Sequence, residues 1–574
     1  MKKISSLLLF AFLLASCYED KGNYDYKLDS MNTISSVTFS PSVTVSAEGN
    51  TIEVQQALDE EDKTRRVDAV LEQSLASNLD ELDFYWCRSY TDEDGNNIKD
   101  TIETKGYLEF DLPVGKPMAY NIFLHIYDNT TTLSHYSSFK LKTRPVFKNS
   151  LFVLHGEEGK RQMGNIEVIG NETKIYTDVK SVTKDDNRYE NAVGFGYSTY
   201  INIPDNFANI GETRVLTVFG NNGETMTYEP FGMKVKYTSA QVFKPQSDNF
   251  SFKKLVQTGD PSNYTQYRIV LTDDGQAYIG NYVHALYKPG YACENNPDLE
   301  HETDYEITAA TITHNRFLMW DAKNNRFLYA AKEDTGFANN EAASIKPGLA
   351  SANPVLDANV KFQALQKSPE GMTAVLGYIN YRDNYDLQNP YFIFKDETTG
   401  DYYRYELLMQ NIGDGSKAKR IGEDEEEKEK LSAYTIVGEK RLAGLTPTDA
   451  STITYNSRFI TSNLFFVEGN TVYRYNVQNG DKFAVYEAPN GYNITKIKFR
   501  AEDNNAFTDD LGLYLNIIMF NGANGAIGEI KFNTAADVDT DYAPLFYDKD
   551  DNGNKWGEIE DIQFVYEYMY KVAY

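Results

Sequence analysis

Cysteine, histidine, tryptophan and proline are all scarce in this sequence, which has 3 Cys, 6 His, 3 Trp and 17 Pro in 574 residues. The low proline content, together with 38 Gly, argues against a fibrous or mainly disordered chain. Cys87 and Cys293 are expected to be free thiols, because they fall in different predicted domains and a disulfide would have to cross between them.

Basic residues are outnumbered by acidic ones, with 56 Lys and Arg against 84 Asp and Glu, and the net charge is -28. A polyanion would meet net repulsion from such a chain, since electrostatic attraction supplies most non-specific nucleic-acid affinity. Nucleic acid is therefore not an expected partner.

Motifs of the common enzyme classes are missing as well. The sequence has no His-Glu-x-x-His zinc site, no Gly-x-Ser-x-Gly nucleophile elbow and no glycine-rich phosphate loop. The six histidines have no recognisable ligand spacing. A non-catalytic protein is expected, although carboxylates drawn from separate loops could still act as a pair without leaving a motif.

What the chain does have is length and aromatic side chains. At 574 residues and 65.2 kDa it exceeds one compact core and indicates at least two domains or one large repeat architecture. Hydrophobic residues make up 41%, and the aromatic content is dominated by 43 Tyr and 32 Phe, rings that pack well on pleated sheets. An all-β protein is predicted.

The N-terminal segment is typical of a secretory signal, with Lys2 and Lys3 before an apolar run from Leu7 to Leu14 that is too short to span a bilayer. Residues 1–16 are expected to be removed. Leu14-Ala15-Ser16-Cys17 resembles the lipobox of bacterial lipoproteins, and this resemblance implies lipidation of Cys17 with acyl chains such as palmitate. Such chains anchor a protein stably to a membrane.

Residues 17–31 are polar and rich in Tyr, and they indicate a lipid-anchored tether. Its acidic pair, Glu19 and Asp20, resembles the surface-export signal of Bacteroidetes lipoproteins. The resemblance implies an outer-membrane protein that is lipid-anchored and faces the cell exterior.

Residues 32–145 show the alternation of β-strands, for instance at Leu82, Phe84 and Trp86 and in the apolar row from Tyr120 to Ile126. A Trp in a middle strand that faces a strictly alternating later strand predicts an immunoglobulin-like β-sandwich.

Three segments carry a more specific resemblance: Cys17 to Tyr26, Leu82 to Trp86, and Ile126 to Asp128. They are similar to the PKD-like family of Bacteroidetes lipoproteins, although the Trp-Asp-Phe-Gly-Asp-Gly stretch of the better-known PKD repeats is absent. The resemblance implies an accessory surface lipoprotein of a SusC/SusD-like nutrient uptake system.

Residues 146–574 repeat a unit in which an apolar strand, a Gly, Asp or Asn turn and an aromatic-rich strand follow one another. We find this hairpin in seven places and predict a β-propeller-like domain of about seven blades, with a large sandwich or double sandwich as the alternative. The predicted hairpins cover residues 151–168, 215–231, 267–282, 317–329, 391–407, 464–475 and 513–532.

An acidic turn near the C-terminus has oxygen-bearing side chains in the alternating order that Ca²⁺ prefers. Ile559 occupies the position of the bidentate Glu of an EF-hand, so a looser Ca²⁺ loop and a solvated acidic hairpin remain the two alternatives. No other cofactor is expected. The candidate calcium ligands are Asp548, Asp550, Asn552 and Glu558.

Aromatic residues in predicted loops are the best candidates for ligand contacts, because a flat ring stacks on a sugar or peptide while its polar atom forms a hydrogen bond. Packing within the blades is the alternative. The candidates are Tyr282, Tyr287, Tyr291, Tyr378, Tyr381, Tyr385 and Trp556.

The expected function is capture of an oligopeptide or glycan for a SusC/SusD-like transporter. Two alternatives remain open: a surface hydrolase that uses carboxylates of the propeller loops, and an adhesion or scaffold lipoprotein that binds proteins.

Overall fold

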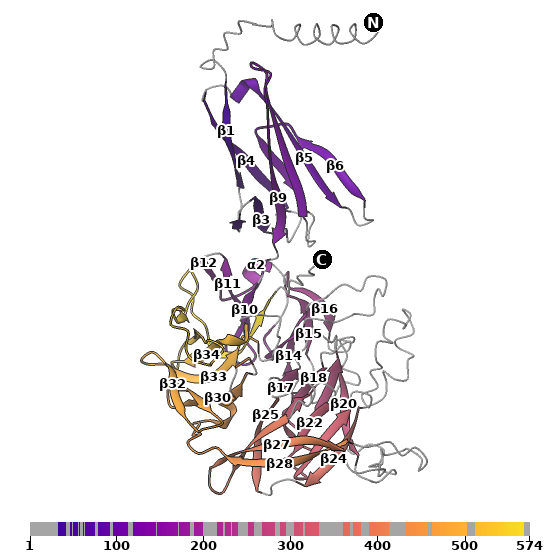
Figure 1. The fold of residues 1–574 in the computed structure, drawn as a ribbon, viewed down its shortest axis with the longest axis vertical. Coiled ribbons are helices and arrows are strands. Elements are labelled where there is room, and N and C mark those ends of the chain that lie inside the picture. The colour runs from indigo at the N-terminus through magenta and orange to yellow at the C-terminus, as the bar shows by residue number, and fades with distance from the viewer. Residues whose placement is uncertain are drawn as a thin grey trace, which may run out of the picture. The chain divides into compact units, whose positions relative to one another are not determined.

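The computed structural model folds almost entirely as β-strands and divides into two compact units, residues 1–145 and 146–574 (Figure 1). No helix in the described part of the chain is long and apolar enough to cross a bilayer. The described residues run from 32 to 566, apart from gaps at 42–45, 75–78, 92–95, 113–118, 184–188, 199–214, 239–250, 258–266, 282–286, 294–303, 332–359, 380–389, 412–431 and 502–510 and shorter gaps of up to three residues.

The first unit contains two β-sheets. The smaller sheet has the order β1-β4-β7 and the larger β2-β3-β9-β8-β5-β6, in which β3 and β9 are parallel. The strands are β1 (Ile34–Pro41), β2 (Ser46–Glu48), β3 (Thr51–Gln55), β4 (Thr64–Gln73), β5 (Leu82–Thr91), β6 (Asn97–Glu103), β7 (Tyr107–Asp111), β8 (Ala119–Asp128) and β9 (Ser134–Arg144).

The core of this unit forms where the alternating apolar side chains of both sheets meet. Trp86 on β5 is fully buried, and its indole N–H donates to the carbonyl of Lys105 at 2.9 Å. Ile122, Leu124 and Ile126 on β8 are buried in the same cluster as Leu108 on β7 of the other sheet. Two packed sheets around a central Trp make this unit the immunoglobulin-like sandwich that the sequence predicts.

The described strands of the second unit form seven four-stranded sheets, two of which join into one eight-stranded sheet where β20 and β24 pair in parallel. Counted along the chain, blade 1 contains β10 (Ser150–His155), β11 (Gln162–Ile169), β12 (Glu172–Tyr176) and β37 (Ile559–Val565). Blade 2 contains β13 (Ala192–Ser198), β14 (Val215–Gly220), β15 (Met226–Glu229) and β16 (Lys234–Thr238). Blade 3 contains β17 (Phe252–Gln257), β18 (Tyr267–Thr272), β19 (Ala277–Asn281) and β20 (Tyr287–Cys293).

The other four blades follow the same order. Blade 4 contains β21 (Ile307–Ile312), β22 (Arg316–Asp321), β23 (Arg326–Ala331) and β24 (Val360–Lys367), and blade 5 contains β25 (Met372–Ile379), β26 (Pro390–Asp396), β27 (Tyr402–Asn411) and β28 (Ser432–Arg441). Blade 6 contains β29 (Thr454–Tyr455), β30 (Asn463–Glu468), β31 (Thr471–Asn476) and β32 (Lys482–Glu487). Blade 7 contains β33 (Asn493–Phe499), β34 (Tyr514–Phe520), β35 (Gly525–Lys531) and β36 (Leu545–Tyr547).

Successive blades pack face to face, and this packing closes the sheets into a ring. Separate hydrophobic clusters join blade 3 to blade 4, 4 to 5, 5 to 6, 6 to 7, and 7 to 1. Blades 2 and 3 meet where the rings of Phe219 and Phe252 stack at 4.3 Å. A ring of four-stranded antiparallel sheets is a β-propeller. The predicted fold class is therefore confirmed, and this unit is not the large sandwich that was the alternative.

The C-terminal strand closes the ring. β37 pairs antiparallel with β10, so blade 1 takes its innermost strand from the end of the chain and its other three from the start of the domain (Figure 1). Asp561 on β37 accepts a hydrogen bond from the main-chain N–H of Phe195 on β13, which ties blade 1 to blade 2. The two ends of the domain therefore stabilise each other.

His155, at the end of β10, is held by hydrogen bonds on both ring nitrogens, one of them to the turn before β37. Its Nε2 lies 2.7 Å from the carbonyl of Thr177, and its Nδ1 accepts the N–H of Gly557 at 3.1 Å, an arrangement that requires the neutral ring with the proton on Nε2. Burial lowers the pKa of His155 below its ordinary value, against the smaller opposing effects of the Thr177 carbonyl and Asp178.

We expect the propeller to lose stability as the pH falls below about 6.5, where an unfolded histidine takes up a proton but the folded one resists it. The loss continues down to the folded pKa and amounts to about 1.4 kcal/mol for each unit by which that pKa is lowered. Melting temperatures between pH 7.5 and 5 would show a flatter profile for His155→Asn. An equally steep profile for the variant would place the pH sensitivity elsewhere.

Candidate functional site

The main candidate site is a cavity of about 550 Å³ on the axis of the propeller. Every innermost strand, namely β13, β17, β21, β25, β29, β33 and β37, contributes at least one lining residue. The cavity is therefore a product of the ring closure and not of any one blade. Its size falls within the range of small-molecule sites.

β-Bulges shape the wall of this cavity. Six of the seven inner strands shift register against their neighbours, and in each the extra residue of the bulge lines the cavity. Bulges re-aim side chains and are common near functional sites. The bulge residues are Val193, Lys253, Thr308, Val375, Thr495 and Glu560.

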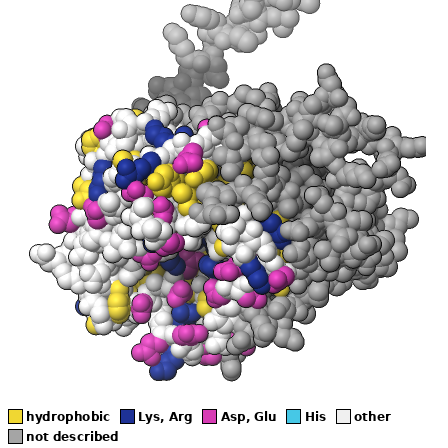
Figure 2. Space-filling view, turned by 90° about the horizontal axis from the view of Figure 1, so that it is seen from below, with side chains coloured by type: hydrophobic (Ala, Val, Ile, Leu, Met, Phe, Trp, Pro, Cys, Tyr) yellow, Lys and Arg dark blue, Asp and Glu magenta, His cyan; other side chains and the backbone are white. Residues whose placement is uncertain are grey.

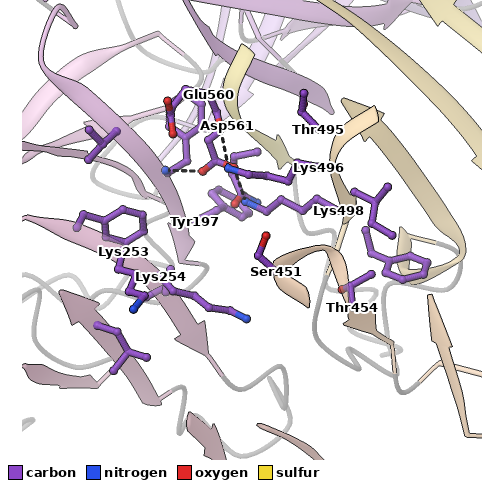
Figure 3. Close-up of a pocket in the computed structure, with 18 of the residues that line it drawn as sticks. Tyr197, Lys253, Lys254, Ser451, Thr454, Thr495, Lys496, Lys498, Glu560 and Asp561 are labelled. Carbon is purple, nitrogen blue, oxygen red and sulfur yellow. Dashed lines mark hydrogen bonds and ion pairs between the residues drawn. The ribbon is translucent and has the colours of Figure 1, made fainter. Parts of the chain in front are cut away.

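Lysine side chains enter the cavity from two walls (Figure 3). Lys253 and Lys254 come from β17, and Lys496 and Lys498 come from β33. Lys254 follows the bulge residue Lys253 directly, so both side chains reach the cavity although neighbours on a regular strand point to opposite faces.

Two of the acidic groups of the wall are bound within the protein. Asp561 receives the main-chain N–H of Phe195 at 2.9 Å and the ammonium of Lys498 at 3.2 Å. Glu560 forms an ion pair of 2.6 Å with Arg161, whose side chain is only 10% exposed. These carboxylates hold blades 1, 2 and 7 together and are not free to act on a ligand.

Arg500, another residue of the cavity wall, is also paired within the protein. Its guanidinium forms a bidentate pair with Glu529, at 2.7 and 2.6 Å, and lies over the ring of Phe564 on β37. Glu529 is 1% exposed and also accepts a hydrogen bond from Tyr542. Burial and the Glu529 charge raise the pKa of Tyr542 well above its usual range.

Hydroxyl and apolar groups complete the wall. Ser451, Thr454 and Thr495 lie on the side of blades 6 and 7, and Tyr197 belongs to blade 2 (Figure 3). Phe252, on β17 of blade 3, also lines the cavity. The cavity thus combines cations, hydroxyls and aromatic surface, which is the composition expected for a polar ligand with some apolar surface.

The sandwich has a hollow of its own, lined by Tyr85, Phe123, His125 and Tyr136 on the outer face of the larger sheet. The rings of His125 and Tyr136 stack on each other at 4.5 Å with an angle of 7°, and Tyr85 stacks on the other side of His125. Because these rings cover one another's faces, this hollow offers less stacking surface than its composition suggests.

The aromatic candidates lie apart from the propeller cavity or outside the described residues. Tyr378 is 5% exposed and packs between Tyr391 and Tyr455 in the core of blades 5 and 6. Trp556 is 1% exposed and meets the ring of His155 edge to face at 5.1 Å. Tyr282, Tyr381 and Tyr385 lie outside the described residues, and Tyr287 and Tyr291 lie on β20 with side chains that are not described.

The acidic turn of residues 548–554 is organised by Asp550. One carboxylate oxygen accepts the main-chain N–H groups of Asn552 and Asn554, and the other accepts Thr177 Oγ1 and the amide of Asn554. Burial opposes ionisation, but the hydrogen bonds outweigh it and hold the pKa of the Asp550 carboxyl below its ordinary value.

These contacts use both Asp550 oxygens within the protein. Asp548 is partly buried, whereas Asn552 and Glu558 are exposed. Among the described residues, no group of three or more His, Cys, Asp or Glu is arranged to hold a metal ion.

The remaining sequence candidates concern the N-terminus and the thiols. Cys17, Glu19 and Asp20 lie outside the described residues. Cys87 is a free thiol on β5, while the side chain of Cys293 is not described.

Sequence reasoning missed the lysines of the cavity, although Lys253-Lys254 and Lys496-x-Lys498 are visible as basic pairs in an acidic chain. On the described part of the face in Figure 2, acidic and basic side chains are intermingled and do not form one patch. Closely spaced lysines in a strongly acidic chain are the signal that could have selected them.

In the comparisons with known proteins, a family model matches the N-terminal part of the chain. Residues 17–187 match the PKD-like family. None of the curated proteins matches this sequence.

Solved structures similar to the chain are remote. They include a quinonprotein alcohol dehydrogenase-like protein from Bacteroides thetaiotaomicron (10% identity, TM-score 0.36, covering 90% of this chain and 97% of that one). They also include the apocarotenoid oxygenase of Synechocystis (5% identity, TM-score 0.33, covering 74% of this chain and 94% of that one). A third is the Aleuria aurantia lectin in complex with a fucosyl-GlcNAc ligand (10% identity, TM-score 0.28, covering 66% of this chain and 96% of that one). Similarity at this level carries no argument about activity, and the propeller assignment rests on strand pairing and blade packing.

Proposed function

We propose that this protein is a non-catalytic binding protein that captures an oligopeptide or a glycan in the axial cavity of its propeller. The observation that carries the proposal is the cavity itself, which all seven inner strands build and which exposes lysines and hydroxyls to a ligand. Two carboxylates of its wall, Glu560 and Asp561, are bound to Arg161 and Lys498, which favours binding over hydrolysis.

We further propose that the protein is a lipoprotein of the outer membrane that faces the cell exterior and serves a SusC/SusD-like transporter. Three features support this location: the lipobox at Cys17, the acidic pair Glu19-Asp20, and the PKD-like match of residues 17–187. A surface protein with a preformed cavity would collect the nutrient and pass it to the transporter.

The test uses intact cells that produce the full chain and fluorescent pools of oligopeptides and of oligosaccharides. We expect cell-associated binding of one pool, measured by flow cytometry. Thr495→Trp, which places an indole at the cavity wall, should abolish it, whereas Thr104→Trp at an exposed site of the sandwich should not.

The Cys17→Ala variant tests the proposed membrane location separately. It should remove binding from the cells while the released protein still binds the ligand in solution. Binding that survives Thr495→Trp would contradict the cavity as the site, and unchanged cell-surface signal with Cys17→Ala would contradict the lipid anchor.

A further inference from the structure

The lysines of the cavity differ in how their charge is compensated. In the described part of the chain, Lys253 is exposed and makes no hydrogen bond or ion pair. Lys496 donates to the main-chain carbonyl of Glu560 at 2.7 Å, an acceptor without a formal charge. Lys498, in contrast, is paired with Asp561. Two ammonium groups therefore lie at the cavity without a carboxylate partner.

The acids of the wall do not cancel this charge. Glu560 is neutralised by Arg161, Asp561 by Lys498, and Arg500 by Glu529. Among the described residues that line the cavity, Asp273 is the remaining acid, and it accepts a hydrogen bond of 2.6 Å from the hydroxyl of Ser251.

After these pairs are set aside, Asp273 is the one described carboxylate of the wall beside Lys253 and Lys496, and Lys254 also lines the cavity. The cavity is thus cationic in a protein whose net charge is -28. Such a local reversal opposes the repulsion that the rest of the chain exerts on an anion.

The backbone conformation of β17 directs the side chains of Lys253 and Lys254 to the cavity. The register shift between Phe252 and Lys254 makes Lys253 the extra residue of a bulge. On a regular strand one of the two consecutive side chains would point away from the cavity. Here both line it, from the wall opposite Lys496 (Figure 3).

We infer that the ligand of this cavity carries a carboxylate group, which Lys253 and Lys496 bind from opposite walls with Lys254 beside them. The inference rests on the proposed function and narrows its ligand to acidic molecules. Ammonium-to-carboxylate hydrogen bonds are among the strongest that proteins form. Both a uronic-acid oligosaccharide and an acidic peptide have this chemistry.

Calorimetry of the full chain with matched probes tests the inference. Trigalacturonate is compared with its methyl ester, and triglutamate with triglutamine. We expect one acidic probe to bind about tenfold or more tightly than its neutral partner, the effect of a charge-assisted hydrogen bond. The affinity should also fall as salt rises from 50 to 200 mM.

The variant Lys253→Gln/Lys496→Gln should remove the preference for the acidic probe, while Lys555→Gln, at an exposed lysine outside the cavity, should keep it. Equal melting temperatures would show that both variants fold. Tighter binding by the neutral probe, or an unchanged preference in the double variant, would overturn the inference and leave the proposed capture standing. No binding of any peptide or glycan at the cavity would overturn both.

Discussion

A chain that ends after Gly557 should lose the folded propeller. This truncation removes β37, the inner strand of blade 1, and exposes the edge of β10. It also removes four buried hydrophobic side chains, those of Ile559, Ile562, Phe564 and Val565. At about 1.5–3 kcal/mol each, their burial contributes roughly 6–12 kcal/mol, which is comparable with the whole stability of a typical domain.

Differential scanning calorimetry would measure the outcome. The full chain should show a cooperative propeller transition that is absent in the truncated chain, while the transition of the sandwich persists. A chain that ends after Tyr566 is the matched control, because it keeps β37 and the carbonyl that accepts the hydroxyl of Tyr197. A propeller transition that survived the loss of β37 would show that blade 1 is stable with three strands.

The blades were predictable because the second strand of each sheet, for example β10 or β14, is buried on both faces. All seven hairpins expected from the sequence are the second and third strands of a blade, from β10–β11 to β34–β35. Such strands form continuous apolar runs, for example Leu151 to Leu154. The turns between them also carry a local signal, since Gly275 has a φ of 78° and Asn325 a φ of 49°.

The inner strands gave no comparable signal, and the cavity was missed for that reason. A bulge shifts the alternation by one residue, so Lys253 and Thr495 break the pattern that identifies a strand. The closure by β37 was also hidden, because β10 and β37 are about four hundred residues apart and no local pattern reports their pairing. The cavity exists only after that pairing.

Side-chain burial explains why the aromatic candidates were a weaker guide than the lysines. Tyr378 and Trp556 both have rings well suited to stacking on a ligand, yet both rings pack inside the protein. In a chain with 43 Tyr and 32 Phe, most rings are needed for the faces between blades. An unpaired lysine in an acidic protein is the rarer feature and carries more information.

Asp321→Ala should strongly destabilise the propeller. Asp321 ends β22 with no exposed surface, and one oxygen accepts the N–H groups of Glu306 and Asn324. The other accepts the amide of Asn324 and Nε of Arg326, at 2.9 and 2.8 Å. The alanine would leave a buried guanidinium without its carboxylate, which costs about 3–5 kcal/mol.

For a domain of this size that loss should lower the melting temperature by about 3–6 °C. Asp304→Ala is the matched control in the same blade, since Asp304 pairs with Lys323 at the surface and its loss should cost less than about 1 kcal/mol. Asp321→Leu/Arg326→Met removes both buried charges and should be more stable than Asp321→Ala. If the double variant were no better, the cost would come from the two lost main-chain hydrogen bonds and not from the lost ion pair between Asp321 and Arg326.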